Sequence, residues 1–98
     1  MQTFDAAAAG ANTGPTVSEV RDWLIACAAA HLRRPADQVA ADVPLVTYGL
    51  DSVTALSIGT QAEDHFGVEL EADALWEHPT VDALAEVVVA AIRASEPA

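Results

Sequence analysis

Apolar residues recur at three- and four-residue steps in separate segments of the chain, a spacing that gathers them on one side of an α-helix. The stretch "VEL" at residues 68–70 is too short for more than an extended turn. In the first helical segment the apolar side consists of Val17, Val20, Leu24, Ala28 and Leu32. In the last segment it consists of Val81, Leu84, Val88 and Ala91. These patterns predict an all-α fold.

Capping and helix-breaking residues set the limits of the first helix. Thr16 and Glu19 have the spacing of a capping box, and Pro35 stops the helix because the residue before a proline avoids the helical region. The connector that follows, residues 35–49, is long, and connectors of this length are often functional. We expect it to be fixed to the core by Val39, Val43, Leu45 and Val46.

A second helix is predicted from about Ser52 to Phe66, and Gly67 is a good residue to end it. With 3.6 residues per turn, its core side consists of Ala55, Ile58, Gly59, Ala62 and Phe66, with Leu56 at the edge. Its solvent side consists of Val53, Ser57, Thr60 and Asp64.

The remaining chain completes a small bundle. A short helical segment lies within "EADALWEHP", residues 71–79, and Thr80 caps the last helix. Three main helices, one short helix and a long first loop make a small four-helix bundle, and 98 residues leave room for one domain with a modest core. We assign residues 16–94 to this domain, residues 1–15 to a disordered leader or linker, and residues 95–98 to a C-terminal tail.

The charge of the chain is strongly negative. Fifteen acidic residues against four arginines give a formal net charge of −11, and residues 35–92 contain no lysine or arginine. Such a surface repels nucleic acid and anionic membranes and speeds encounters with basic protein patches. The alternative is that the acids only keep the domain soluble. The acidic residues of this span are Asp37, Asp42, Asp51, Glu63, Asp64, Glu69, Glu71, Asp73, Glu77, Asp82 and Glu86.

Other features narrow the class of protein. No apolar run approaches the roughly 20 residues of a membrane span, and the N-terminus lacks the pattern of a signal peptide. We therefore expect a soluble, cytoplasmic monomer. Cys27 is the single cysteine, so it forms no internal disulfide, and no Cys/His cluster suggests a metal site.

The stretch "TYGLDSVTALSIG", residues 47–59, places a serine where the connector gives way to the second helix. Ser52 is expected to be exposed, close to backbone N–H groups without intrahelical partners and at the positive end of the helix dipole. Tyr48 and Gly49 would let the chain turn sharply into the helix. The residues alone leave two interpretations: Ser52 only caps the helix, or a group is attached to it.

The order of these elements, with "GLDSV" at residues 49–53 and "HPT" at residues 78–80, resembles the acyl carrier protein family. The similarity covers roughly residues 17–93. Within the family, the chain looks most like the carrier domains of bacterial polyketide synthases. Peptidyl carriers tend to have a second glycine where Leu50 stands, so "GLDS" favours acyl or ketide cargo. A peptidyl carrier and a fatty-acid-type carrier remain the alternatives within the family.

The resemblance implies a function and a set of partners. In that family the serine matching Ser52 receives a 4′-phosphopantetheine arm from coenzyme A, and the arm's thiol holds acyl groups as thioesters. The acid matching Asp51 lies near the magnesium ion of the transferase. The chain would then be no enzyme itself, and its partners would be a phosphopantetheinyl transferase, an acyl-loading enzyme (an acyltransferase or an acyl-AMP ligase) and a ketosynthase or other synthase domains. We expect these partners to bind the second helix through Val53, Ser57, Thr60, Glu63 and Asp64.

Some residues depart from the family pattern. Val53 is smaller than the leucine or methionine that often follows the serine. Gly59 and Ala62 stand where many carriers have bulkier residues; they indicate close helix packing, which we favour, or a cavity that could admit part of an acyl chain. The lack of arginine along residues 57–67 favours a freestanding or loading-type carrier.

Two interpretations lie outside the carrier class. A serine hydrolase would need a G-x-S-x-G elbow, which "GLDSV" lacks, and 98 residues are too few for the sheet that poses such a triad. The other is a non-carrier acidic helical interaction module, with or without phosphorylation of Ser52. The histidines are expected at a helix end, on the surface and in a turn rather than as ligands, and Cys27 in the core rather than reactive.

Overall fold

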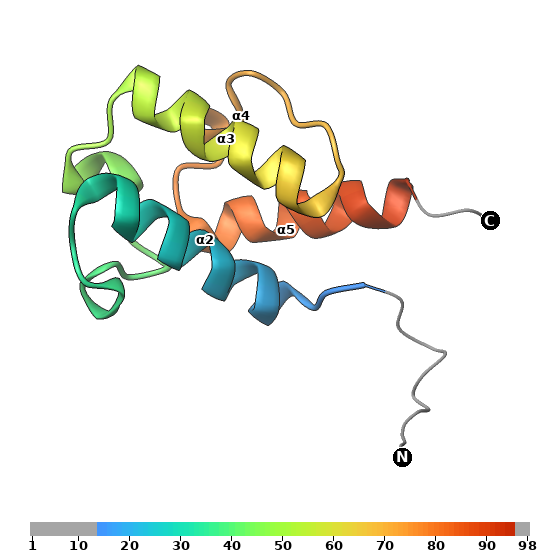
Figure 1. Ribbon diagram of the computed structural model, residues 1–98, viewed down its shortest axis with the longest axis horizontal. Coiled ribbons are helices and arrows are strands. Elements are labelled where there is room, and N and C mark those ends of the chain that lie inside the picture. The colour runs from blue at the N-terminus through green and yellow to red at the C-terminus, as the bar shows by residue number, and fades with distance from the viewer. Residues whose placement is uncertain (1–13, 96–98) are drawn as a thin grey trace, which may run out of the picture.

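The computed structural model describes residues 14–95, so residues 1–13 of the predicted leader and residues 96–98 of the predicted tail lie outside the described range. Within that range the chain forms four α-helices and two short 3-10 turns, without any β-strand (Figure 1). The all-α prediction is confirmed. The elements are α2 (Val17–Leu32), η1 (Ala36–Gln38), η2 (Leu45–Tyr48), α3 (Ser52–Phe66), α4 (Ala74–Glu77) and α5 (Val81–Ala94).

The predicted capping residues start and end the helices as expected. Thr16 Oγ1 accepts a hydrogen bond from the Glu19 N–H at 3.1 Å, and the Glu19 carboxylate accepts one from the Thr16 N–H at 2.8 Å. This reciprocal pair is the predicted capping box. At α5, Thr80 Oγ1 accepts from the Ala83 N–H at 3.1 Å. Gly67 ends α3 with φ 68°, a conformation that glycine adopts without strain.

The core lies where α2, α3 and α5 meet, with α4 closing one side of α3. The buried side of α3 is formed by Ala55, Ile58 and Ala62, as the helical spacing predicts, whereas Gly59 and Phe66 of the predicted core side are half-buried. Several of the buried residues are alanines, which contribute little apolar area, so the core is modest for the chain length. Its largest fully buried side chains are Val20, Leu24, Leu45, Ile58, Val81, Leu84 and Val88. None of the helices in residues 14–95 combines the length and apolarity that a membrane crossing requires.

The connector between α2 and α3 differs in part from the prediction. Val39 and Leu45 are buried as expected and Val43 is half-buried, but Val46 is 48% exposed, and Leu50 is buried instead. The cause is the 3-10 turn η2: a turn of four residues presents one side to the core, and Leu45 occupies it. The loop has no helical period of its own from which this choice could be predicted.

Two backbone hydrogen bonds fasten the connector to the turn before α5 and to the first turn of α5. The Leu45 N–H donates to the Pro79 carbonyl oxygen at 2.9 Å, and the Asp82 N–H donates to the Ala41 carbonyl oxygen at 2.9 Å. Within the connector, the Ala40 N–H donates to Tyr48 Oη at 2.9 Å. These bonds hold the chain in place just before α3 begins.

Acidic side chains dominate the surface and are scarcely paired. Within residues 14–95 the single ion pair joins Arg21 Nη1 of α2 to Asp82 Oδ1 of α5 at 3.5 Å, with both side chains partly exposed. Glu69, Glu71 and Glu77 surround one small surface depression next to α4. Like charges gathered in this way repel one another and weaken the compact state.

We therefore expect Glu71→Gln to raise the melting temperature by about 1–3 °C at low ionic strength, since one exposed charge interaction contributes a fraction of 1 kcal/mol. Added salt should raise the melting temperature of the parent chain and erase the difference, because salt screens surface charges. Thermal denaturation followed by circular dichroism over a salt series measures both effects. Melting temperatures that do not change with salt would contradict the proposed repulsion.

Candidate functional site

Ser52 is the first residue of α3, and its side chain is exposed. The N-cap of the helix is Asp51, whose Oδ1 accepts a hydrogen bond from the Thr54 N–H at 2.8 Å. The interpretation of Ser52 as the capping residue is therefore wrong: the carboxylate one position earlier does the capping. Gly49, with φ 94° and ψ 20°, makes the turn that directs the chain into this cap.

The carboxyl group of Asp51 is ionised at neutral pH. The hydrogen bond from the Thr54 N–H stabilises its charged form and holds the pKa of this carboxyl below its usual value. Because the folded-state pKa is lowered, the cap stabilises α3 at pH values above the ordinary aspartate range. That stabilisation is lost as the pH falls through the lowered pKa. A fixed negative charge thus lies next to the Ser52 hydroxyl.

The surroundings of Ser52 suit an attached anion and offer no internal base. The first turn of an α-helix has N–H groups without intrahelical acceptors, and the helix dipole favours a negative group there. His65 lies in the last turn of the same helix, about 20 Å along its axis from Ser52 at 1.5 Å per residue. Its ring stacks on Trp23, with centroids 4.7 Å apart. His65 is therefore too far from Ser52 to act on its hydroxyl.

Apolar side chains lie exposed on α3 beside Ser52. Val53 is 74% exposed and Leu56 is 54% exposed. Together with Ser57, Thr60 and Gln61 they line a shallow depression of about 380 Å³. Leu56, expected at the edge of the core, belongs to this open side, and the helical period alone leaves its position undecided.

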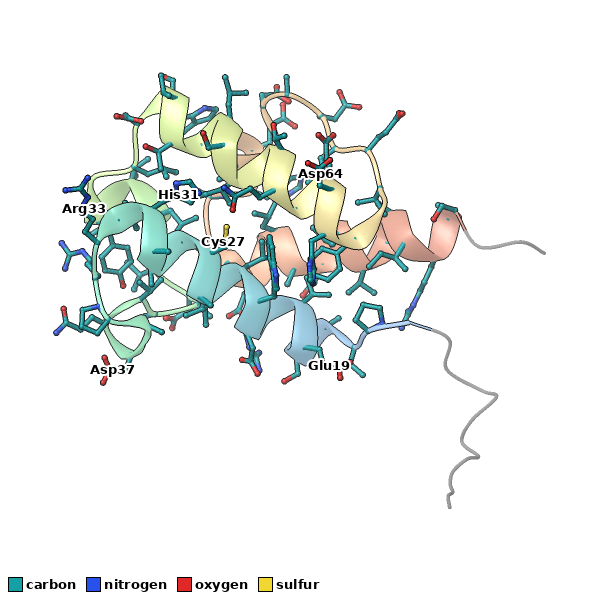
Figure 2. The ribbon with its side chains drawn as sticks, viewed as in Figure 1. Glu19, Cys27, His31, Arg33, Asp37 and Asp64 are labelled. Carbon is teal, nitrogen blue, oxygen red and sulfur yellow. The ribbon has the colours of Figure 1, made fainter. Side chains whose placement is uncertain are left out.

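The two acids expected to flank this surface have different environments. Asp64 is exposed and points away from the core (Figure 2). Glu63 is half-buried, and its Oε2 accepts a hydrogen bond from the Leu70 N–H at 2.7 Å. Glu63 therefore holds the loop after α3, a role that the sequence could not reveal because the partner is a backbone group seven residues away.

The cleft beside Gly59 is small. An alanine Cβ at this position would meet only Leu75 Cδ1, at 3.8 Å, an ordinary contact. Close packing therefore does not require glycine here. The cleft between α3 and the α4 region has a volume of about 50 Å³, whereas an apolar cavity that holds benzene is about 150 Å³. In this conformation the cleft has no room for an acyl chain.

Cys27 lies between α2 and α3 (Figure 2) and is half-buried rather than fully in the core. Its thiol donates a hydrogen bond to Gln61 Oε1 at 3.3 Å. Burial raises the pKa of the Cys27 thiol, so the reactive thiolate is disfavoured. Within the described part of the chain, the acids, histidines and Cys27 form no cluster of three that could hold a metal ion.

Comparison with known proteins identifies the family. A family model described as "Phosphopantetheine attachment site" matches residues 22–88. The chain is 41% identical over 68 residues to a phenolphthiocerol/phthiocerol polyketide synthase of Mycobacterium tuberculosis. This match covers 69% of the chain and 4% of that synthase, so the chain spans a small fraction of the relative's length.

Solved structures agree with this match. The acyl carrier protein LipD from Actinoplanes friuliensis is 43% identical with a TM-score of 0.68, covering 97% of this chain and 100% of LipD. A free-standing peptidyl carrier protein from Acinetobacter baumannii is 34% identical with a TM-score of 0.73, covering 76% of this chain and 92% of its own. Because the family match spans more than half of its residues, the chain belongs to the phosphopantetheine-binding carrier family, whose members are non-catalytic domains that hold a covalent 4′-phosphopantetheine arm.

Proposed function

We propose that this chain is an acyl carrier protein of the polyketide type, with the 4′-phosphopantetheine arm attached to the hydroxyl of Ser52. The observation that carries the proposal is the position of Ser52: an exposed hydroxyl at the first residue of α3, next to the ionised cap Asp51, inside the family-matched segment. The arm's thiol would hold an acyl or ketide intermediate as a thioester. Separate enzymes would make and break the bonds.

The cargo class follows from Leu50 and from the relatives. Leu50, at the position where peptidyl carriers tend to have glycine, is buried and packs in the core. The match to a polyketide synthase also favours acyl or ketide cargo. A peptidyl carrier is the second candidate, because one similar structure is a peptidyl carrier protein. The mass of the group carried on the arm after purification from the native host distinguishes the two.

The partners we propose are a phosphopantetheinyl transferase, an acyl-loading enzyme and a ketosynthase or another synthase domain. We propose the cytoplasm as their location, because a thiol that must stay free between loading steps requires a reducing compartment. The docking surface would be the exposed side of α3, formed by Val53, Leu56, Ser57, Thr60 and Asp64. Its charge suits a partner with a basic patch.

Ser52→Ala should abolish attachment of the arm when the chain is incubated with coenzyme A and a phosphopantetheinyl transferase. Intact-protein mass spectrometry should show the pantetheine increment for the parent chain and none for the variant. The melting temperature should stay the same, because Asp51 rather than Ser52 caps α3. The matched control is Ser18→Ala, since Ser18 is another exposed serine in the first turn of a helix. Attachment to the Ser52→Ala variant would show that the arm is held elsewhere.

Substitutions at Asp51 should separate its capping role from a role in attachment. Asn caps helices about as well as Asp, so Asp51→Asn should retain most of the stability, whereas Asp51→Ala should lower the melting temperature. If the carboxylate also serves near the magnesium ion of the transferase, both variants should accept the arm more slowly. Initial rates of attachment, measured beside thermal melts, test this. If the arm is attached to Asp51→Asn at the parent rate, the role of Asp51 is limited to capping α3.

Asp64→Lys should slow association with the acyl-loading enzyme, and added salt should shrink the difference, because exposed charges act mainly on the association rate. Val53→Asp should instead raise the dissociation rate by placing an unpaired charge in the docked contact. Neither residue is buried, so both variants should fold. Charge reversal at Glu63 is unsuitable as a test, since it breaks the bond to the Leu70 N–H. Unchanged transfer kinetics for both variants would place docking elsewhere.

A further inference from the structure

Two arginines lie at the end of the bundle where α3 begins, the same end that carries the acids Asp37 and Asp51. Arg33 and Arg34 directly follow α2, and both side chains are exposed. Figure 1 shows the C-terminal end of α2, the turn η2 and the start of α3 at the same end of the molecule. In Figure 2, Arg33 projects from that end, away from Asp64. Since residues 35–92 contain no lysine or arginine, these are the positive charges nearest to Ser52 along the chain.

Arg34 is held against the turn that leads to Ser52. Its guanidinium carbon lies 5.2 Å from the centroid of the Tyr48 ring, a cation–π distance. The Tyr48 hydroxyl is fixed in turn by the Ala40 N–H at 2.9 Å. The four-residue step from Tyr48 to Ser52 can span no more than about 14 Å between Cα atoms. A positioned positive charge therefore lies on the turn that leads into α3.

Neither arginine is engaged in an ion pair in residues 14–95, where the pairing is between Arg21 and Asp82. Arg33 has φ 58°, the one left-handed conformation of a non-glycine residue in this range. The helix end itself uses only backbone groups, such as the Arg34 N–H bonded to the Ala29 carbonyl at 3.0 Å. Glycine would make the same bonds with less strain. The capping of α2 thus does not require an arginine side chain at Arg33.

The turn η2, which Arg34 contacts through Tyr48, also carries an exposed apolar residue. Val46 lies in the same turn as Tyr48 and is 48% exposed. Arginine beside exposed apolar surface is a composition typical of protein interfaces. We call Arg33, Arg34 and Val46 together the arginine surface.

We propose that the arginine surface is a second docking contact and that the loading partner presents an acidic patch to it. This inference rests on the proposed carrier function. The guanidinium group matches a carboxylate with two parallel hydrogen bonds. At physiological ionic strength charges are screened over about 8 Å, so a partner in contact senses these two arginines rather than the net charge of the whole chain. Opposite charges on the α3 acids and on the arginine surface would fix the orientation in which the arm enters the partner.

The direction in which one substitution changes the rate of acyl loading tests the proposal. Arg34→Gln makes the chain more negative, so a partner that binds only acids would load the variant as fast as the parent or faster. The arginine surface predicts the opposite: kcat/KM for acyl loading of the phosphopantetheinylated chain falls on the order of fivefold at low salt, and less at high salt. The matched control is Arg93→Gln, an exposed arginine in the last turn of α5, whose loading should not fall. Loading of Arg34→Gln at the parent rate or above overturns the proposal.

Arg33→Gly separates docking from a structural role. Glycine suits the left-handed conformation at this position, so the melting temperature should hold or rise while acyl loading slows. A loss of loading that accompanies a matching loss of thermal stability would assign the arginine a structural role instead, and would overturn the proposal.

Two further outcomes are distinguishable. If Arg34→Gln raises the KM for coenzyme A during attachment but leaves acyl loading unchanged, the arginines bind a phosphate of coenzyme A, and the acidic-partner proposal is wrong. Intact mass distinguishes failure of the carrier function from failure of the second contact. A parent chain that never gains the arm contradicts the carrier function, whereas an armed chain loaded equally with and without Arg34→Gln contradicts the second contact alone.

Discussion

The two hydrogen bonds that join the long connector to the turn before α5 and to the first turn of α5 are the constraint on which the site depends. Leu45 and Ala41 are tied by their backbones to Pro79 and Asp82, and the Leu45 side chain fills the core at the same point. The chain is thereby delivered to Asp51 in the extended conformation that a helix cap requires. Ser52, which we propose as the attachment residue, is then held on a fixed base, and only an arm beyond it would have to move.

The period of α3 sorts its residues into two functions. Ala55, Ile58 and Ala62 are buried, and the side chains one or two positions away, such as Val53 and Leu56, are exposed. Substitutions on the exposed side should therefore have little effect on the fold, and this is the side that we propose for docking. Glu63 is the exception, because its carboxylate leaves the solvent side to bind the Leu70 N–H. A substitution that changes the charge at Glu63 therefore also changes the stability, whereas one at Asp64 changes the charge alone.

Local signals predicted most of the fold from the sequence. Thr16, Thr80 and Gly67 bound helices through their own backbone neighbours, so their spacing along the chain was sufficient. Whether Asp51 or Ser52 caps α3 was not predictable in this way, since both residue types cap helices well and the path of the connector decides between them. The exposure of Val46 and the burial of Leu50 likewise depend on tertiary contacts.

Long-range contacts also decide how α3 is held along its length. The Trp23–His65 stack and the Glu63–Leu70 bond anchor its C-terminal half, and Asp51 fixes its start. At Gly59, between them, a mid-helix glycine costs about 1 kcal/mol relative to alanine, and no close contact requires it. The intrinsic stability of α3 is thus lowest where it faces the cleft of about 50 Å³ beside α4. Space for any acyl chain would have to be made by moving α4 away from this point, at the expense of the buried contacts of Leu75.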